Sequence, residues 1–337
     1  MIGGEEHGRF RELVDRHQDI VVTTHMNPDG DALGSQLVVA RYLREQGKKV
    51  RMVNADPAPE TLGFLEGAAE IPVYDAAVHK AWLAEADLVV LVDNSAPDRL
   101  GRMEDPMREV ADKVLCIDHH PTRGNPWKHN ILDTAACATA AIVHELVTEQ
   151  GFVADDASAL AMYVGIATDT GFFRFNSTTA QAHAIASRLL AAGVDPARPY
   201  QEIYEGNSEA YTRLLGHALA DLRLDAGGAI ASVRLTRELQ ERCGAVDVDS
   251  SEMTTALLAM RSVRIAVLFR DLPDGKIKVS LRSKGNVNVH SLATQFGGGG
   301  HRNASGIVLD GGMDEAVELV TGKATELLAA TDAGSME

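Results

Sequence analysis

Short apolar runs alternate with helical patterns through the first 190 residues of the chain. The runs are continuously apolar, which is typical of strands that are covered on both faces of a parallel sheet. They lie at residues 19–25, 49–55, 87–95 and 113–120. Helical periodicity marks residues 32–47, 137–151 and 157–171. This rhythm is that of βαβ units, so we predict an N-terminal α/β domain with a parallel sheet.

The pattern changes beyond this region. Segment 192–200, AGVDPARPY, holds two prolines and a glycine and predicts a domain boundary. We expect a first domain over 1–191, a linker and connecting helix over 192–220 with the helix near 201–220, and a second, smaller α/β domain over 221–337. The second domain has predicted strands at 227–236, 262–271 and 275–283, a turn at 273–275 that joins the last two as a hairpin, and a helix at 314–330.

The net charge restricts the partners of the protein. The 337 residues include 48 Asp and Glu against 32 Lys and Arg, a formal charge of −16. Proteins that coat long nucleic acid carry a basic face, which this composition disfavours. A small anion can still bind where metal ions supply local positive charge. The three cysteines form no CxxC pair, and the chain shows neither a leader pattern nor an apolar run of about 18 residues, so we expect a cytoplasmic protein without a membrane partner.

A polar loop follows the first predicted strand. Its sequence is HMNPDGD, in which Pro28 and Gly30 fix a tight turn, so His25, Asp29 and Asp31 can converge. An imidazole with two carboxylates suits Mn²⁺, Mg²⁺ or Zn²⁺. The alternative is a polar turn in which Asp31 caps the next helix.

Three further acidic or histidine clusters end predicted strands or helices. Asp93 ends the apolar run DLVVLVD, where a carboxylate needs a partner or caps a helix. Asp118, His119 and His120 end KVLCIDHH, and because successive residues face different ways, we expect one histidine to bind metal while the others orient it or face substrate. Asp169 lies in GIATDTGFF at the end of a helical stretch. Four clusters at element ends of one domain favour a shared site over unrelated caps.

These segments resemble a known family. THMNPDGDALGS, LVDNS, IDHHPT and ATDTG look like the four motifs of the DHH phosphoesterase superfamily, without departure from them. FGGGGHRNASG (296–306) and VSLRSKG (279–285) resemble the DHHA1 substrate-binding domain, which we match only in these segments. The compact length is similar to the stand-alone NrnA type, the nano-RNases and phosphatases of adenosine 3′,5′-bisphosphate (pAp). RecJ exonucleases carry extra domains, and family II pyrophosphatases lack the GGGH segment.

The resemblance implies two divalent metal ions, usually Mn²⁺, with Mg²⁺ or Co²⁺ as alternatives. One ion would be held by His25, Asp29 and Asp93, and the other by Asp31, Asp93, His119 and Asp169. It further implies that Asp93 bridges the ions, that Asp118 supports the site from behind, and that His120 faces the scissile phosphate. Two metals 3.5–4 Å apart, roughly, activate water and brace an in-line displacement, so no Ser or Cys nucleophile is needed.

The second domain would recognise the substrate. Arg282 ends a predicted strand, and its planar fork suits a pair of phosphate oxygens. The glycines of 297–300 let backbone N–H groups approach an anion closely, although a flexible surface loop is the alternative. We therefore assign substrate contacts to Arg282, Gly298, Gly299, Gly300 and His301.

Two other groups of residues leave alternatives open. Phe172, Phe173 and Phe175 are either core residues or a wall for base stacking, and Arg174 beside them is either a phosphate contact or a surface charge. His144 lies in a predicted amphipathic helix, where we expect it on the surface.

The sequence thus predicts a dinuclear-metal phosphohydrolase of short oligoribonucleotides (nano-RNA, or linear dinucleotides such as pApA), of pAp, or of both. Cyclic di-AMP phosphodiesterase and exopolyphosphatase or pyrophosphatase activities are the alternatives. The complete set of metal-binding residue types disfavours a nucleotide-binding regulator without activity. The charge of −16 and an aromatic content of 5% disfavour long nucleic acid, so substrates of about 2–5 nucleotides are expected. A homodimer is left open.

Overall fold

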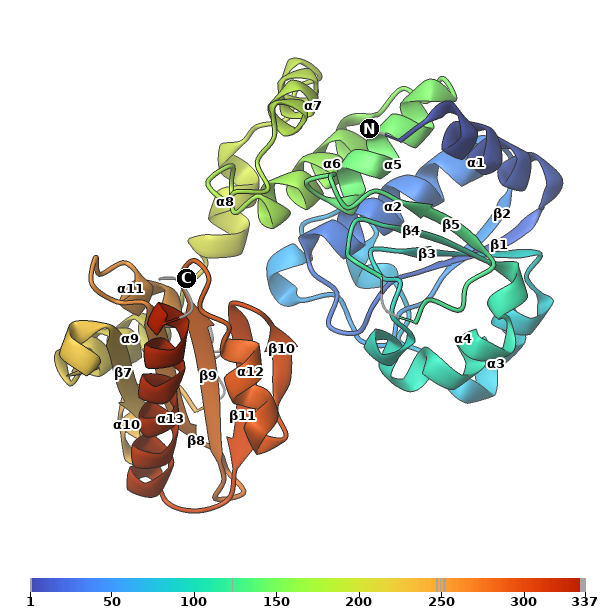
Figure 1. Ribbon diagram of the computed structural model, residues 1–337. Coiled ribbons are helices and arrows are strands. Elements are labelled where there is room, and N and C mark those ends of the chain that lie inside the picture. Colours follow the sequence, from blue (N-terminus) through green and yellow to red (C-terminus); the bar gives the residue numbers. More distant parts are fainter. Residues whose placement is uncertain (1, 123, 247, 249, 251–252, 334–337) are drawn as a thin grey trace. The chain divides into compact units, whose positions relative to one another are not determined.

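The computed structural model describes residues 2–122, 124–246, 248, 250 and 253–333 (Figure 1). The chain divides into two compact units, Met1–Gly206 and Asn207–Glu337, which are called the first and the second unit below. None of the described helices is long and apolar enough to cross a membrane.

A five-stranded parallel sheet forms the centre of the first unit (Figure 1). Its strand order is β2-β1-β3-β4-β5, and because every pair is parallel, the carboxyl ends of the strands lie along one edge. Strands β3 and β4 are buried throughout, as their continuous apolar sequences require. The strands span β1 Asp19–Thr23, β2 Lys49–Met52, β3 Leu88–Val92, β4 Val114–Asp118 and β5 His129–Leu132. The predicted parallel α/β domain is confirmed, although the short β5 was not predicted.

Helices cover both faces of this sheet. Alternating strand residues enter two separate apolar clusters: Ile20 packs on one side with α1, α2, α5 and α6, while Val21 packs on the other with α3 and α4. The helices are α1 Gly4–Arg16, α2 Gly30–Glu45, α3 Ala76–Glu85, α4 Glu104–Glu109, α5 Thr139–Glu149, α6 Asp156–Asp169, α7 Ala180–Ala191 and α8 Ala197–Tyr204. Short 3-10 turns lie at Glu60–Leu62, Ala68–Glu70, Pro97–Met103 and Ala111–Lys113.

Helices α2 and α6 meet at glycines. A Cβ on Gly30 would lie 2.5 Å from Thr168 Oγ1, and a Cβ on Gly34 would collide with the carbonyl oxygen of Ala161. Only glycine permits this approach of one helix to the backbone of the other. The contact holds the start of α2 against the end of α6.

A mixed six-stranded sheet forms the second unit. Its order is β10-β11-β9-β8-β7-β6, in which β7 and β8 are parallel and the other pairs antiparallel. The strands are β6 Arg223–Asp225, β7 Ile230–Leu235, β8 Ile265–Asp271, β9 Ile277–Ser283, β10 Gly299–His301 and β11 Ala304–Leu309. The helices are α9 Glu209–Ala220, α10 Arg237–Cys243, α11 Met253–Leu258, α12 Val289–Ala293 and α13 Met313–Ala333, with 3-10 turns at Ala226–Gly228 and Thr294–Phe296. Helices α12 and α13 contribute to one apolar cluster, and α9, α10 and α11 to another. A second, smaller α/β domain was predicted and is confirmed.

The single connecting helix predicted near 201–220 is wrong. Two helices, α8 and α9, replace it, and α8 ends at Tyr204. The intervening Gly206 favours a break, and Ser208 caps α9 by accepting a hydrogen bond from the Tyr211 N–H.

Candidate metal centre

The predicted site residues of the first unit gather at the carboxyl edge of the parallel sheet. His25 follows β1, Asp93 follows β3, and Asp118 is the last residue of β4. Helix α2 carries Asp31 in its first turn, and α6 ends at Asp169. Ligands of open parallel sheets bind at this edge because helix starts and strand ends meet there.

Three groups of metal-binding residue types form at this edge: two that together contain the six predicted ligands, and a third made of Asp93, His119 and His120. In each group, one candidate ligand atom per residue lies within 4.8 Å of the others. The first group is His25, Asp29 and Asp93, and the second is Asp31, His119 and Asp169.

Asp93 approaches both groups. Its Oδ2 lies 3.3 Å from His25 Nε2, and its Oδ1 lies 3.7 Å from His119 Nε2. His119 Nε2 is also 3.0 Å from Asp169 Oδ2 and 3.9 Å from Asp31 Oδ2. One carboxylate therefore reaches histidines of both groups.

Backbone carbonyls orient the two histidines. His25 donates its Nδ1–H to the carbonyl of Met26 at 2.7 Å, and His119 donates its own to the carbonyl of Ala136 at 3.3 Å. A histidine that donates from Nδ1 presents the lone pair of Nε2, the arrangement that histidine ligands of metals use. Both Nε2 atoms are buried and make no hydrogen bond within the described part of the chain.

The start of helix α5 holds two of the carboxylates. Asp31 accepts the backbone N–H groups of Thr139, at 2.6 Å, and of Ala140, at 2.7 Å. The hydroxyl of Thr139 donates to Asp93 Oδ1 at 2.9 Å. Two successive helical N–H groups favour a carboxylate through the positive end of the helix. Thr139 was missed from the sequence, where only its position near the start of the helical pattern 137–151 marked it.

The capping role expected for Asp31 differs from the one observed. It is Asp29 that caps α2, by accepting the N–H groups of Asp31 and Ala32, while Asp31 itself caps α5. Asp31 thereby ties α2 to α5.

Backbone strain concentrates at this site. Five non-glycine residues of the described chain have positive φ: one is the candidate ligand Asp93, and three others, Asn27, Phe172 and Phe173, lie within four residues of a candidate ligand. Asp93 itself has φ of 58°. Such conformations persist only where surrounding contacts enforce them, and they gather at functional sites.

Asp118 and His120 form a hydrogen-bonded pair. The Nδ1–H of His120 donates to Asp118 Oδ1 at 2.8 Å, and the backbone N–H of His120 donates to the same oxygen at 3.0 Å. Burial would raise the pKa of Asp118, but the hydrogen bonds and charge of His120 outweigh it and leave the pKa lowered. His120 Nδ1 also lies 3.6 Å from Asp93 Oδ1, so the pair adjoins the shared carboxylate.

The carboxylates repel one another strongly. Burial, followed by the charges of Asp93, Asp169 and Asp29, raises the pKa of Asp31 well above its usual value. Burial alone would lower the pKa of His119, but Asp169 and Asp93 raise it to about 9. The neighbouring carboxylates contribute to both pKa shifts, and this concentration of negative charge favours a nearby cation.

The site has a buried floor and an open rim. The side chains of His25, Asp31 and Asp93 are at most 2% exposed. In contrast, Asp29 is 55% exposed and His120 is 33% exposed. A ligand can therefore reach the cluster from solvent past Asp29 and His120 without displacing the buried side chains of His25, Asp31 and Asp93.

The residues present fit divalent cations. Carboxylate oxygens suit Mg²⁺ and Mn²⁺, and imidazole nitrogens suit transition metals, so the mixed set is compatible with divalent metal ions. The two buried Nε2 atoms support the same conclusion, because they lie beside carboxylates but have no hydrogen-bond partner among the described residues.

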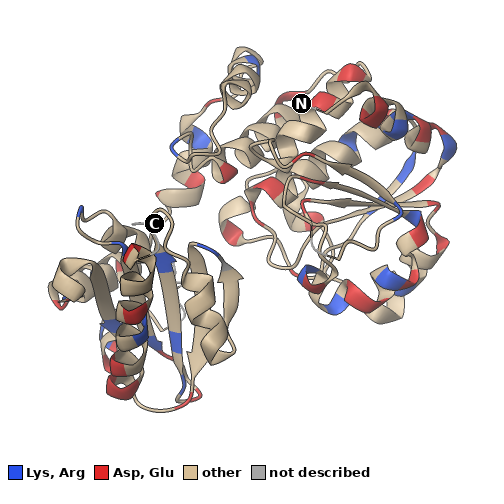
Figure 2. Ribbon diagram, in the orientation of Figure 1, with Lys and Arg blue, Asp and Glu red and all other residues tan. Residues whose placement is uncertain are grey.

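The predicted substrate residues of the second unit lie on β9 and on or just before β10, two strands that are separated by β11 in the sheet. Arg282 of β9 and His301 of β10 are both paired with Ala304 of β11, and Figure 2 shows further positive charge along β9. The side chain of His301 lies outside what the structure describes.

The glycine segment is not the loop that the sequence suggested. Gly299 and Gly300 belong to strand β10, at the edge of the sheet. A Cβ on Gly298 would collide with the carbonyl oxygen of Gly306, and Gly300 has φ of 133°. Gly298 and Gly300 are therefore required for close backbone packing, whatever the strand binds.

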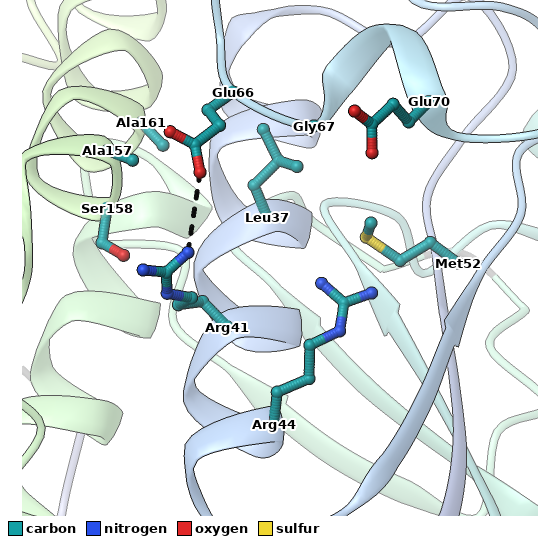
Figure 3. A pocket seen from close by; sticks show the side chains of 10 residues that line it. All are labelled: Leu37, Arg41, Arg44, Met52, Glu66, Gly67, Glu70, Ala157, Ser158 and Ala161. Atoms are coloured by element: carbon teal, nitrogen blue, oxygen red, sulfur yellow. Dashed lines mark ion pairs between the residues drawn. The ribbon is translucent and has the colours of Figure 1, made fainter.

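A separate cavity of about 210 Å³ lies along α2 and includes none of the predicted site residues (Figure 3). Arg41 and Arg44 project into it, and Arg41 pairs with Glu66 at 3.7 Å.

Family models match both units of the chain. The model of the DHH family, N-terminal domain, matches residues 19–166, and that of the DHHA1 domain matches residues 240–330. The bifunctional oligoribonuclease and PAP phosphatase NrnA of Thermus thermophilus is 34% identical over 302 residues, which cover 89% of this chain and 87% of that protein. The chain belongs to the DHH family.

Other DHH relatives agree in length. The Bacillus subtilis protein of the same name is 28% identical over 86% of this chain and 89% of its own length. An exopolyphosphatase-related protein from Bacteroides fragilis has a solved structure with a TM-score of 0.90 and 31% identity, covering 97% of both chains. The whole architecture of this DHH–DHHA1 chain is thus shared with known proteins.

Proposed function

We propose that this DHH protein is a divalent-metal phosphohydrolase that acts on short oligoribonucleotides and on pAp. The observation that carries the proposal is the pair of histidine–carboxylate groups that both approach Asp93. The names of the relatives from T. thermophilus and B. subtilis, which align over most of their length, supply the substrate class.

The six residues of the first unit are the proposed metal ligands. We assign His25, Asp29 and Asp93 to one ion, and Asp31, Asp93, His119 and Asp169 to the other, with Mn²⁺ as the preferred metal. When bound, such ions stabilise negative charge on phosphoryl oxygens and activate water as a nucleophile at neutral pH.

The chain's own residues organise the site around the substrate. Thr139 fixes the rotamer of Asp93 through its hydrogen bond to Oδ1. Asp118 holds the His120 ring through Nδ1, so that the remaining nitrogen is the one available to a substrate. We assign to His120 the stabilisation of phosphoryl charge or protonation of the leaving oxygen. Its exposure, compared with the buried floor, suits direct contact with substrate.

The second unit is proposed to bind substrate phosphate. Arg282 is the main contact, since a guanidinium pairs two N–H groups with two phosphate oxygens. Strand β10 is a sheet edge, whose outer backbone groups are not paired within the described sheet and suit an anion. We include Gly298, Gly299, Gly300 and His301 in this contact.

The charge of the chain supports short substrates. At −16, the protein repels phosphates that extend beyond the metal centre, so we expect best turnover at about 2–5 nucleotides.

A hydrolysis panel tests the proposal. Metal-stripped protein is reloaded with Mn²⁺, Mg²⁺ or Co²⁺ and assayed on pAp, pApA, cyclic di-AMP, RNA of 2 to about 24 nucleotides and polyphosphate. We expect strict metal dependence, best activity with Mn²⁺, and preference for pAp and the shortest RNA. Activity on polyphosphate alone, or equal rates on the longest RNA and on dinucleotides, contradicts the proposal.

A further inference from the structure

The loop after Asp169 contains three successive residues with positive φ. Gly171, Phe172 and Phe173 have φ of 57°, 54° and 64°. Left-handed backbone is disfavoured for residues with a Cβ, and it persists only where neighbouring contacts impose it. We therefore expect this left-handed backbone conformation to be imposed by the side chains that the loop positions.

The first two phenylalanines pack inward. The Phe172 ring meets Tyr200 at 5.1 Å and Tyr204 at 5.4 Å, and Phe173 stacks on His183 at 5.2 Å. Both phenylalanines adjoin the main apolar cluster of the first unit. These two half-buried rings pack against the core, which favours the packing alternative over the stacking one for Phe172 and Phe173.

The next two residues turn outward and are held in place. The backbone N–H groups of Arg174 and Phe175 donate to the carbonyl of Thr170, at 3.0 and 2.9 Å. The Phe175 ring lies against Gly171, where a Cβ would come within 2.5 Å of it, and yet Phe175 is 52% exposed. A fixed and exposed aromatic ring is suited to stack on a flat ligand.

Arg174 is fixed beside this ring. Its guanidinium carbon lies 5.5 Å from the Phe175 ring centroid, and its Nε–H donates to the carbonyl of Gly171 at 3.0 Å. Among the described residues, Arg174 takes part in no ion pair, although the same edge of the unit is rich in carboxylates. The remaining guanidinium N–H groups are therefore suited to an external anion.

The loop adjoins the metal centre within one unit. The hydroxyl of Ser177 donates to the carbonyl of Asp169 at 3.2 Å, which closes the loop onto the candidate ligand. The aromatic ring, the cation and the ligand Asp169 thus lie on one short, hydrogen-bonded segment.

We propose that Arg174 and Phe175 form a subsite for a nucleotide: Phe175 stacks on its base, and Arg174 contacts a phosphate other than the scissile one. This inference rests on the proposed function and adds to it a reason for selecting nucleotides over base-free phosphate esters. Stacking is tolerant of base identity because every base has an aromatic face.

The test compares an intact dinucleotide, pApA, with analogues that lack the base at one or the other position. Phe175→Ala should lower kcat/KM for pApA by about tenfold, the scale of losing one stacked base, and should leave unchanged the value for the analogue that lacks the stacked base. Phe175→Tyr should restore wild-type behaviour. Val153→Ala removes an 84% exposed apolar side chain elsewhere in the unit and serves as the control.

Arg174 is tested by the number of phosphates. Arg174→Ala should lower kcat/KM for pApA by about tenfold, but that for ApA, which has only the scissile phosphate, by less than twofold. Metal content should equal that of the wild type in every variant.

Each of the other possible results contradicts a specific part of the proposal. The stacking role is refuted if Phe175→Ala has no effect, or if it slows turnover of the intact and base-lacking substrates equally. The proposed function still holds in that case, provided that the wild-type protein hydrolyses pApA. Equal losses on pApA and ApA refute the role of Arg174. A wild-type protein that leaves every nucleotide intact refutes the proposed function itself, and the subsite with it.

Discussion

The carboxyl edge of the first sheet and the β10 edge of the second differ in whether side chains or backbone packing determine the choice of residues. At the first edge, side chains are held by specific partners: His25 by a carbonyl, and Asp93 by Thr139. At the second edge, Gly298 and Gly300 provide close backbone packing rather than side-chain chemistry. Changes at the first edge should therefore alter the chemical step, and changes at the second should alter substrate binding.

The largest effect is expected at the shared carboxylate. Asp93→Ala should lower kcat by at least about a thousandfold, because it removes the ligand that reaches both groups and leaves two cations unscreened. Metal analysis and steady-state kinetics on Mn²⁺-reloaded protein measure it. Asp98→Ala, an exposed carboxylate a few residues on, is the control and should change little. Retention of substantial activity by Asp93→Ala would refute the dinuclear assignment.

A smaller effect, of a different kind, is expected in the second unit. Arg282→Ala should reduce kcat/KM by about tenfold to a hundredfold, the loss of one charge-assisted contact, and should leave metal content intact. Lys278→Ala, exposed on the same strand, is the matched control. If Arg282→Ala lost its metal together with its activity, the second edge would not be restricted to substrate binding.

The supporting shell of the first edge gives a more modest test. Thr139→Val keeps the shape of the side chain but removes the hydroxyl that donates to Asp93, so kcat should fall by about tenfold. Thr139→Ser should retain most activity. If Thr139→Val raised KM and left kcat unchanged, the first edge would not be dedicated to the chemical step.

The smallest effect concerns stability. His144 is buried in α5, which corrects its expected surface position, and burial followed by the charge of Arg188 lowers its pKa to about 4. Because an unfolded histidine titrates near 6.5, this neutral group gives full stability above that pH and loses it as pH falls towards 4. The free energy of unfolding should fall by roughly 1 kcal/mol between pH 7.5 and 6.

Urea unfolding of the wild type and of His144→Leu at both pH values measures this change. The variant should show a flatter dependence on pH. An identical slope in both proteins would mean that α5, which holds Asp31 and Asp93, is not the acid-sensitive element.

The sequence predicted the parallel sheet and the meeting of its acidic clusters for a simple reason. Continuous apolar runs identify buried parallel strands, and parallel strands end at one edge, so the residues that follow them must converge. Asp93 and Asp118 could be placed in this way, although their roles stay proposals. The resemblance to the DHH motifs then indicated which residues of these clusters to propose as metal ligands.

Other features depended on contacts between distant segments. Thr139 meets Asp93 only because α5 packs behind the sheet edge, and nothing in its local sequence distinguishes it from an ordinary helix start. The burial of His144 likewise depends on neighbours that helical periodicity does not reveal. Glycines 299 and 300 form a strand because β11 supplies a partner, whereas glycine alone suggests a loop.

The glycine contact between α2 and α6 has a consequence for ion selectivity. The two helices already touch backbone to side chain, and a Cβ on Gly165 would lie 3.1 Å from Asp31 Oδ1. The position of Asp31 therefore depends on the close packing of α2 against α6. Mg²⁺ binds oxygen ligands at roughly 2.0–2.1 Å, and Ca²⁺ binds them at about 2.3–2.6 Å. The size of ion that the site accepts should therefore depend on how rigidly the helices hold their carboxylates. An engineered change of metal would therefore have to alter these glycines as well as the ligands themselves, because Gly30 lies between Asp29 and Asp31 and Gly165 faces Asp31.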